Sequence, residues 1–414
     1  CMKEFNELLE NYSEGKTLPQ EFYTNETIFS EEMKRIYHHQ WLLADHVTRI
    51  PNPGDYFLFN AGKESIIVIR GKDSQVRAFY NVCTHRGSRV CLEDEGSKNL
   101  LVCPYHAWSY TNEGKLQAAR YMPDDFNKED WGLRPCHIKI YEGLIFLNLS
   151  ITKPLNFDDF IKPLQPMLEM HQPSSAKIAF RKKYPTAANF KLVIENFTEC
   201  YHCGPSHPEL CAIHEKDWVY TMGGGQGTAP EKDTKEYLEK IKPWIEDCKQ
   251  RGLPTDTYLE EEKPFEQGIN RYADRTPIGN GHLSQTKDGK PASTLMGKFD
   301  KFDGGLTQVS FNPFGCCYFT NDFGIMFAFK PKSLNETEVE LIWLVDQNAQ
   351  EGDDYKIEDI AYIWDVTTVA DTRIIENNQS GLLSRAYSPG VLSRNESGIT
   401  YLYNWYFNSM RSST

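Results

Sequence analysis

The chain has 414 residues and a formal net charge of −13 at pH 7. This acidity argues against nucleic acid or an anionic membrane surface as the main partner, because phosphate binding needs a basic face. No run approaches the ~18 apolar residues of a membrane span, and the acidic N-terminus lacks an apolar signal segment. Eleven irregularly spaced cysteines are unlike a secreted disulfide framework, so we expect a reducing, cytoplasmic location.

A chain of this length suits two packed domains, and the fold class that we predict is α+β. Residues 1–40 are expected to form an N-terminal helical segment that packs on the larger domain. Residues 41–155 should form a small antiparallel-β domain. Residues 156–414 should form the larger domain, with an antiparallel sheet flanked by helices.

The first half of the chain begins with a predicted helix over residues 24–40, with Ser30 as its N-cap. From Trp41 to about Leu149, short β-rich runs alternate with Gly, Pro and Asn turns. The clearest strands in this part are residues 65–70 and 144–149.

The second half is predicted to contain a helix at about 189–203 and a long helix at about 354–377. Residues 223–291 are rich in Gly, Lys, Glu and Pro, which indicates loops. The GGGQG run at 223–227 lacks a βαβ context, so it is not a nucleotide cradle. Strands are expected at 305–311, 317–319, 324–329 and 338–344.

Two short motifs, C-T-H-R-G at 83–87 and C-P-Y-H at 103–106, each supply one cysteine and one histidine. Two thiolates on one iron and two imidazoles on the other are the ligand set of a Rieske [2Fe–2S] cluster. The alternative is a structural zinc site, but such sites usually pair C-x₂-C with H-x₃₋₅-H. The candidate cluster ligands are Cys83, His85, Cys103 and His106.

A second metal site is indicated by the predicted helix at 189–203. Asn196, Glu199 and His202 are spaced i, i+3, i+6, on one side of such a helix. Gly204-Pro205 then interrupts the helix, which lets His207 turn toward the same metal. Two histidines without a carboxylate call for an acid from elsewhere, which would complete a facial triad for non-haem iron.

Asp371 is the candidate for that acid. It belongs to an inward-facing stripe of the long predicted helix, where an unpaired ionised carboxylate is costly to bury. Asp365 and Glu376 project elsewhere on the same helix. The alternatives are a buried Asp371 satisfied by arginine or backbone donors, and histidines that belong to the core or surface. The stripe comprises Ile357, Ile360, Trp364, Thr367, Asp371 and Ile374 or Ile375.

Together these motifs resemble the α-subunits of Rieske oxygenases, over about residues 23–407. The run E-N-x-x-E-C-Y-H-C-x-P-x-H-P-E, at 195–209, looks like the family's iron motif. The phrases at 364–382 and 402–407 are similar to a homo-oligomeric branch that demethylates or hydroxylates quaternary ammonium zwitterions. Glycine betaine, stachydrine, choline and carnitine are examples of such substrates.

The resemblance implies that the four cysteines and histidines of 83–106 bind the cluster, and that His202, His207 and Asp371 bind the catalytic iron. It implies that Glu199 links a metal-ligand histidine to a cluster-ligand histidine of the neighbouring subunit, although many members have aspartate there. Asn196 is a further catalytic candidate. Members form head-to-tail trimers, because cluster and iron lie too far apart within one subunit.

The implied function is a terminal oxygenase that hydroxylates an N-methyl group of a small cationic or zwitterionic substrate with O₂, releasing formaldehyde. Because the chain has no dinucleotide fingerprint, a separate flavin- or ferredoxin-type NAD(P)H reductase must supply electrons. The rivals are an aromatic-ring hydroxylating dioxygenase α-subunit and an electron carrier with only the cluster.

A quaternary ammonium cannot accept a hydrogen bond, so aromatic faces should hold it through cation–π contacts of about 0.5–2 kcal/mol each. Ordinary sheet core is the more common role for any one of the candidate rings. These candidates are Phe311, Phe314, Tyr318, Phe319 and Phe327.

Overall fold

The computed structural model describes residues 2–10, 12–214, 231–255 and 271–411. The chain forms two compact units. The smaller unit comprises residues 39–155. The larger unit combines residues 1–38 with residues 156–414, so the N-terminal segment groups with the C-terminal two thirds of the chain.

The smaller unit is built from three antiparallel sheets, with strand orders β4-β3-β2-β5, β1-β10-β9 and β6-β7-β8. The strands expected at 65–70 and 144–149 are present as β3 and β10. Its strands are β1 (Leu42–His46), β2 (Asp55–Ala61), β3 (Glu64–Arg70), β4 (Val76–Tyr80), β5 (Glu95–Ser97), β6 (Leu101–Val102), β7 (Ser109–Tyr110), β8 (Leu116–Ala118), β9 (His137–Tyr141) and β10 (Leu144–Asn148).

The larger unit contains one six-stranded antiparallel sheet with the order β11-β16-β15-β14-β13-β12. All four strands expected from the sequence in this part belong to it. Its strands are β11 (Ala176–Thr186), β12 (Tyr272–Pro277), β13 (Gly305–Asn312), β14 (Gly315–Phe319), β15 (Phe323–Ser333) and β16 (Glu336–Asp346).

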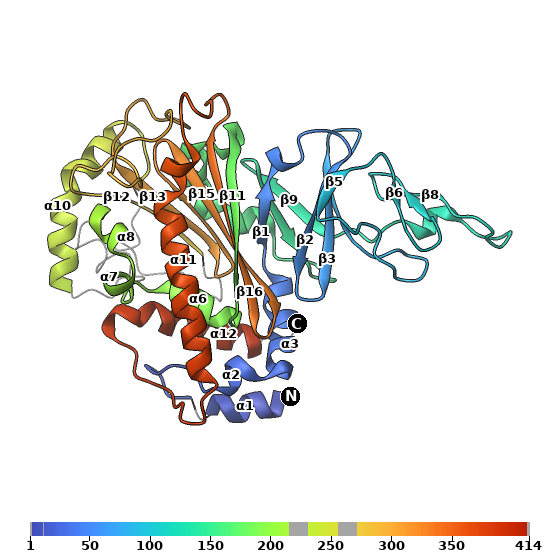
Figure 1. The fold of residues 1–414 in the computed structure, drawn as a ribbon, viewed down its shortest axis with the longest axis horizontal. Coiled ribbons are helices and arrows are strands. Elements are labelled where there is room, and N and C mark those ends of the chain that lie inside the picture. The colour runs from blue at the N-terminus through green and yellow to red at the C-terminus, as the bar shows by residue number, and fades with distance from the viewer. Residues whose placement is uncertain (1, 11, 215–230, 256–270, 412–414) are drawn as a thin grey trace. The chain divides into compact units, whose positions relative to one another are not determined.

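Helices surround this sheet, and the long helix α11 crosses one of its faces (Figure 1). None of the helices in the described ranges is long and apolar enough to cross a membrane. They are α1 (Met2–Glu10), α2 (Glu21–Thr24), α3 (Glu26–Arg35), α4 (Phe157–Ile161), α5 (Gln165–His171), α6 (Phe190–Thr198), α7 (Cys203–Ser206), α8 (Pro208–Ile213), α10 (Glu231–Gln250), α11 (Ile357–Leu382) and α12 (Ser397–Arg411).

The apolar stripe predicted on the long helix is confirmed. Ile360, Trp364, Thr367, Asp371 and Ile375 are all buried on α11. Their spacing of three and four residues places them on one face, which packs toward β11 and α6. The helix therefore presents one carboxylate within an otherwise mostly apolar contact surface.

The predicted N-cap of the first helix is wrong. Helix α3 begins at Glu26, and the side chain of Asn25 accepts hydrogen bonds from the backbone N–H groups of Thr27 and Ile28. Ser30 lies inside the helix. The earlier asparagine is an equally strong capping residue, and it leaves Ser30 within the first turns.

The loop prediction for residues 223–291 is also wrong in part. Helix α10 occupies 231–250, and strand β12 occupies 272–277. The buried residues of α10 recur at spacings of three and four: Tyr237, Ile241, Ile245 and Cys248. The many charged residues between them concealed this period. The GGGQG run lies outside the described residues.

Candidate metal centres

The two loops that carry the predicted cluster ligands have the same backbone geometry. In the first loop the N–H of Cys83 donates to the carbonyl of Ser88 (2.8 Å), and the N–H of Gly87 donates to the carbonyl of Cys83 (2.9 Å). The second loop repeats both bonds around Cys103 and Ala107. Gly87 and Ala107 both adopt positive φ values, 80° and 58°, a region that glycine enters at little cost. The two motifs thus form a matched pair of turns.

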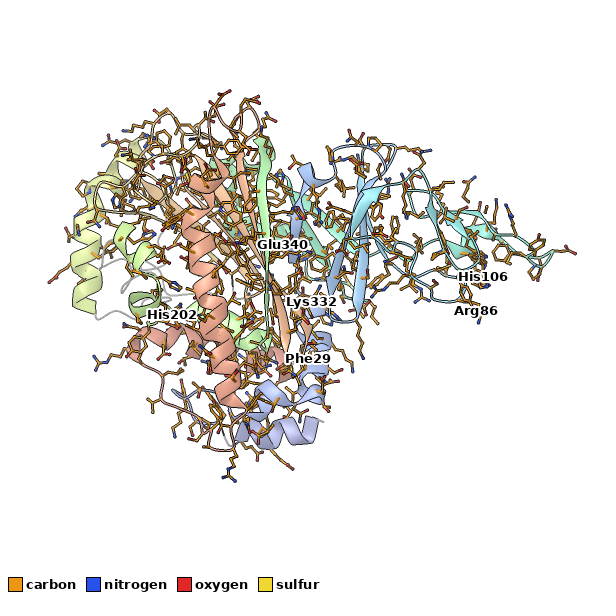
Figure 2. The ribbon with its side chains drawn as sticks, viewed as in Figure 1. Phe29, Arg86, His106, His202, Lys332 and Glu340 are labelled. Atoms are coloured by element: carbon orange, nitrogen blue, oxygen red, sulfur yellow. A yellow bond between two sulfur atoms is a disulfide. The ribbon has the colours of Figure 1, made fainter. Side chains whose placement is uncertain are left out.

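In these turns the two thiols are buried in the smaller unit, whereas the two imidazoles lie nearer its surface. Cys83 and Cys103 are each 2% exposed and belong to the hydrophobic core of the smaller unit. The rings of His85 and His106 lie 4.8 Å apart, and His85 stacks on Trp108 at 4.7 Å. His106 is exposed, at the end of the unit that also carries Arg86 (Figure 2).

The local electrostatics act differently on the two kinds of candidate ligand: burial disfavours the thiolate form of cysteine but favours the neutral form of histidine. Burial raises the pKa of the Cys83 thiol, whose sulfur lies 3.2 Å from the hydroxyl of Tyr110. Partial burial, together with the neighbouring His106 and Arg86, lowers the pKa of His85. His85 is therefore neutral near pH 7, which is the form that binds a metal. Two buried thiols facing two neighbouring imidazoles fit the donor set of a Rieske cluster.

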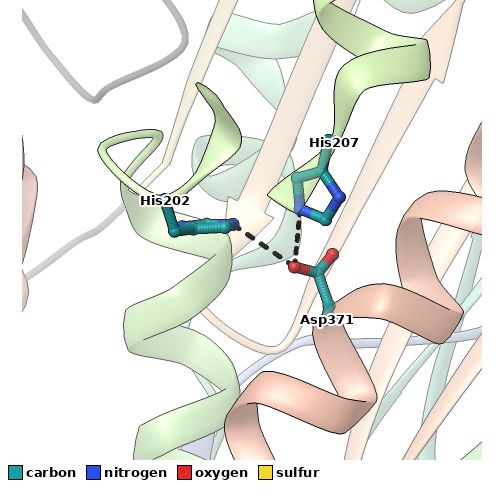
Figure 3. Close-up of side chains that lie close together, drawn as sticks. All are labelled: His202, His207 and Asp371. Atoms are coloured by element: carbon teal, nitrogen blue, oxygen red, sulfur yellow. Dashed lines mark hydrogen bonds and ion pairs between the residues drawn. The ribbon is translucent and has the colours of Figure 1, made fainter. Parts of the chain in front are cut away.

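The second constellation also assembles. His202, His207 and Asp371 each offer one ligand atom, and these atoms all lie within 4.8 Å of one another (Figure 3). Oδ1 of Asp371 lies 2.9 Å from Nε2 of His207 and 3.3 Å from Nε2 of His202. Asp371 is buried, as is His207, whereas His202 is partly exposed. Two imidazoles and one carboxylate on one side of a metal leave other coordination positions open.

The path of the chain to this site differs from the prediction. Helix α6 ends at Thr198, and Glu199 is extended with φ −130° and ψ 163°. The Glu199 carboxylate accepts hydrogen bonds from the backbone N–H groups of Tyr201 and His202, which replaces the helical bonds there. The predicted helix over Asn196, Glu199 and His202 is therefore wrong at its C-terminal end.

The expected helix break at Gly204-Pro205 is likewise wrong in place, because both residues lie within the short helix α7. The two turns of chain that orient the imidazoles lie at Glu199–His202 and at His207, whose φ and ψ are −127° and 64°. His207 is thus held at the junction of α7 and α8.

Asn196 and Glu199 nevertheless reach His202 from two sides. Oε1 of Glu199 lies 2.6 Å from Nδ1 of His202, and Nδ2 of Asn196 lies 3.3 Å from Nε2 of the same ring. Burial acts to lower the pKa of His202, but hydrogen bonds to Asp371 and Glu199 raise it to about 9. The site therefore attracts positive charge at Nε2.

Glu209, which was not predicted as a site residue, lies near the second histidine. Its carboxylate lies 3.8 Å from Nδ1 of His207 and accepts a hydrogen bond from the hydroxyl of Thr367 (3.3 Å). The distance of 3.8 Å is too long for a hydrogen bond, and Nδ1 of His207 is buried without a hydrogen-bond partner among the described residues, so Glu209 lies near this ring without holding it. A carboxylate thus lies near Nδ1 of each histidine, but of the two only Glu199 is within hydrogen-bond distance, and Asp371 lies between the two rings.

A disulfide joins Cys200 and Cys203, on either side of Tyr201 and His202. This pairing was not predicted from the sequence, and the bond closes a four-residue loop around a predicted iron ligand. The bond adds a covalent restraint to the turn that replaces the end of α6.

A cavity adjoins this segment. It lies between α6, whose last turn immediately precedes Glu199, and the strands β12–β15. Of the predicted aromatic candidates, Tyr318 lines it and Phe327 packs against Tyr318 (5.4 Å). Phe314 packs on Phe190, and Phe319 stacks on His171. The lining comprises Ile194, Phe197, Thr198, Tyr272, Gln308, Ser310, Asn312, Pro313, Cys316, Tyr318 and Phe329.

Comparison with known proteins agrees with these two centres. Residues 40–141 match the Rieske [2Fe-2S] domain, and residues 174–412 match the ring hydroxylating alpha subunit (catalytic domain). The chain belongs to the family of Rieske oxygenase α-subunits. It is an enzyme that carries a Rieske [2Fe–2S] cluster and a mononuclear iron, which excludes the zinc site and the simple electron carrier.

Three named relatives show which members of this family the chain is similar to. The glycine betaine monooxygenase oxygenase subunit of Pseudomonas aeruginosa is 36% identical over 411 residues, covering 98% of this chain and 91% of that protein. The carnitine monooxygenase oxygenase subunit of Escherichia coli is 35% identical over 221 residues, 52% of this chain and 58% of that protein. The biphenyl 2,3-dioxygenase subunit alpha of Rhodococcus jostii is 26% identical over 356 residues, 80% and 69% of the two chains.

Among solved structures, the fold is similar to that of the quaternary ammonium Rieske monooxygenase CntA in complex with γ-butyrobetaine. That similarity has a TM-score of 0.65 at 23% identity, covering 97% of this chain and 98% of the other. It supports the fold of both units.

Proposed function

We propose that this protein is the terminal oxygenase of a system that removes an N-methyl group from a quaternary ammonium compound, with glycine betaine as the first candidate. The observation that carries the proposal is the cluster of His202, His207 and Asp371 in a chain that is 36% identical, over nearly its full length, to glycine betaine monooxygenase oxygenase subunits. No single contact in the cavity is needed for this assignment.

We assign the two metal groups to the two sets of side chains described above. Cys83, His85, Cys103 and His106 would hold the cluster. His202, His207 and Asp371 would hold the mononuclear iron. When bound, the two groups supply stored electrons, O₂ activation and oxidation of a C–H bond.

The chain's own residues would position the iron ligands. The Glu199 carboxylate accepts a hydrogen bond from Nδ1–H of His202. The proton then stays on Nδ1, which leaves Nε2 free to bind a metal. Glu209 lies 3.8 Å from Nδ1 of His207, which is too far for a hydrogen bond. Asn196 holds its amide beside Nε2 of His202, at the edge of the proposed iron position.

The overall reaction consumes O₂, two electrons and two protons, and inserts one oxygen atom into an N-methyl C–H bond. The other oxygen atom leaves as water. The N-hydroxymethyl product then breaks its C–N bond, with the electron pair remaining on nitrogen. The products are formaldehyde, a proton and a tertiary amine. A separate NAD(P)H-dependent reductase would supply the electrons. The homotrimer and the cytoplasmic location stay predictions from the sequence.

The test is a substrate panel with a surrogate reductase, scored by formaldehyde release. Glycine betaine, choline, carnitine and stachydrine form one arm, and biphenyl and naphthalene form the other. The proposal predicts formaldehyde from at least one member of the first arm. A cis-diol from the second arm without formaldehyde from the first would identify an aromatic-ring dioxygenase instead.

A further inference from the structure

Asp274 is a buried acid in the middle of β12, with 6% of its surface exposed. Within the part of the chain that the structure describes, no N–H or O–H group donates to its carboxylate and no cation pairs with it. The neighbouring Arg275 is committed to Asp303, at 2.7 Å. A buried carboxylate without a partner is costly, so its retention calls for a reason.

The register of the sheet places Asp274 on the side of the sheet that faces the cavity. Asp274 pairs with Gln308 on β13, and Gln308 pairs with Tyr318 on β14. Residues directly opposite one another on neighbouring strands point to the same face. Gln308 and Tyr318 both line the cavity, as does Tyr272, two residues before Asp274 on the same strand. The carboxylate is therefore aimed at the wall of this cavity.

The residues that line the cavity are neutral, and they include both polar and aromatic side chains. All of the lining residues named above are uncharged. The rings of Phe197, Tyr318, Phe327 and Trp364 form a continuous cluster beside it, with centroid separations of 5.0–6.0 Å. Asp274 is thus a charged residue that the sheet register places beside a cavity whose lining residues are neutral.

We propose that Asp274 is a specificity-determining residue, the counter-charge for the cationic head group of the substrate. The inference rests on the proposed function and names the group that would recognise the quaternary ammonium. The head group cannot accept or donate a hydrogen bond, so it needs aromatic faces and an opposite charge. Asp274 supplies the charge at the sheet, and the aromatic cluster supplies the faces.

Two further observations support this role. Burial raises the pKa of Asp274 to about 7, so a bound cation would stabilise a carboxylate that the empty cavity destabilises. The cavity also begins at the last turn of α6, next to the segment that carries His202. A head group in this cavity would therefore lie beside the chain segment that precedes His202.

The test measures charge selectivity by binding. Isothermal titration would give Kd for choline and for 3,3-dimethylbutan-1-ol, its neutral isostere, with the holoenzyme and with Asp274→Asn. We expect the variant to weaken choline binding by about tenfold or more, as for other close charge pairs, and to leave the isostere nearly unchanged. Asp274→Glu, which keeps the charge, should recover part of the preference.

Asp322→Asn is the matched control. Asp322 is also a buried aspartate, but its carboxylate accepts hydrogen bonds from Ser284 and Thr320, at 2.7 and 2.8 Å. This variant should lose stability without a change in the ratio of the two Kd values. If the ratio of the two Kd values changed equally in both variants, the proposed role of Asp274 would be refuted. The change would then reflect a general structural effect of removing a buried carboxylate.

The outcomes separate the two proposals. Formaldehyde release from a quaternary ammonium compound with an unchanged choline preference in Asp274→Asn refutes the counter-charge and leaves the oxygenase proposal intact. Charge-selective binding that depends on Asp274, without formaldehyde from any panel member, supports the cation site and refutes demethylation. A wild-type protein that prefers the neutral isostere refutes the counter-charge outright.

Discussion

The carboxylate of Glu199 lies 2.6 Å from Nδ1 of His202, on the opposite side of the imidazole from Asp371. The same carboxylate accepts backbone hydrogen bonds from the N–H groups of Tyr201 and His202. One side chain therefore ends helix α6 and orients a proposed iron ligand. Its geometry makes Glu199 a positioning residue, since no atom of it belongs to the group of three ligand atoms.

Glu199→Gln should retain the cluster spectrum and most of the mononuclear iron. Loss of a carboxylate beside a metal-ligand histidine typically costs about 10–100-fold in affinity or activity. Because Glu199 is also expected to couple the two centres across a subunit interface, the pre-reduced cluster should reoxidise at least tenfold more slowly with O₂ and substrate. Stopped-flow absorption would measure that rate. A normal rate would exclude the coupling role, and loss of most iron would make Glu199 essential to the metal site.

The division of ligands between two centres predicts a selective loss of metal. Anaerobically purified protein should hold about three irons and two acid-labile sulfides per chain, as the two sites require. His202→Ala should lose the mononuclear iron and keep the visible absorption of the cluster. Iron and sulfide analysis with absorption spectra would check both. Bleaching of the cluster in this variant would show that the ligands have been divided wrongly.

Asp371→Ala should abolish turnover and deplete the mononuclear iron, because it removes the one anionic ligand of the set. Asp365→Ala is the control on the same helix. Asp365 binds Lys182 and the hydroxyl of Tyr184, both at 2.6 Å, and so is committed to β11. Its loss should leave the iron content nearly unchanged. Iron depletion in Asp365→Ala but not in Asp371→Ala would show that an acid other than Asp371 is the third ligand.

The unpartnered Asp274 predicts a pH-dependent stability difference. Its folded-state pKa, raised by burial to about 7, lies above the ordinary value, so the wild type loses stability as pH rises from about 4 to 7. Asp274→Asn removes that loss. Its Tm should exceed that of the wild type, by a margin that grows between pH 5 and pH 8.

Neighbouring groups do not obscure this measurement. Burial raises the pKa values of Tyr318 and Cys316 well above that range, so neither titrates between pH 5 and pH 8. Thermal unfolding of both proteins at a series of pH values would give the margin. A margin that is constant or shrinks with pH would show that Asp274 is not an isolated buried acid.

The candidate ligand residues could be selected from the sequence because each motif is local, and the structure brings His202, His207 and Asp371 together. The cluster loops could be recognised from the spacing of cysteine and histidine within five residues. Asp371 could be recognised because it falls in the periodic apolar stripe of a single helix. The turn at Glu199 could not be predicted, since a side chain there competes with the backbone for the bonds that would have extended α6.

Other features could not be predicted from the sequence for a different reason. The role of Asp274 depends on its register with Gln308 and Tyr318, which are distant in sequence, and no local pattern encodes such pairing. Strand β11, residues 176–186, was missed because five of its residues are charged or proline and only some of its side chains are buried. Helix α10 was also missed, because its many charged residues hide the periodic spacing of its apolar residues.

The most direct test of the account is a single turnover without a reductase. Chemically reduced holoenzyme would be mixed with O₂ and glycine betaine, and both cluster oxidation and formaldehyde would be measured. If the cluster delivers electrons to an iron at His202, His207 and Asp371 that oxidises an N-methyl group, formaldehyde should form in about one-to-one ratio to oxidised cluster, and Asp371→Ala should form none. Cluster oxidation without formaldehyde, for glycine betaine and for every other quaternary ammonium compound of the panel, would contradict the account.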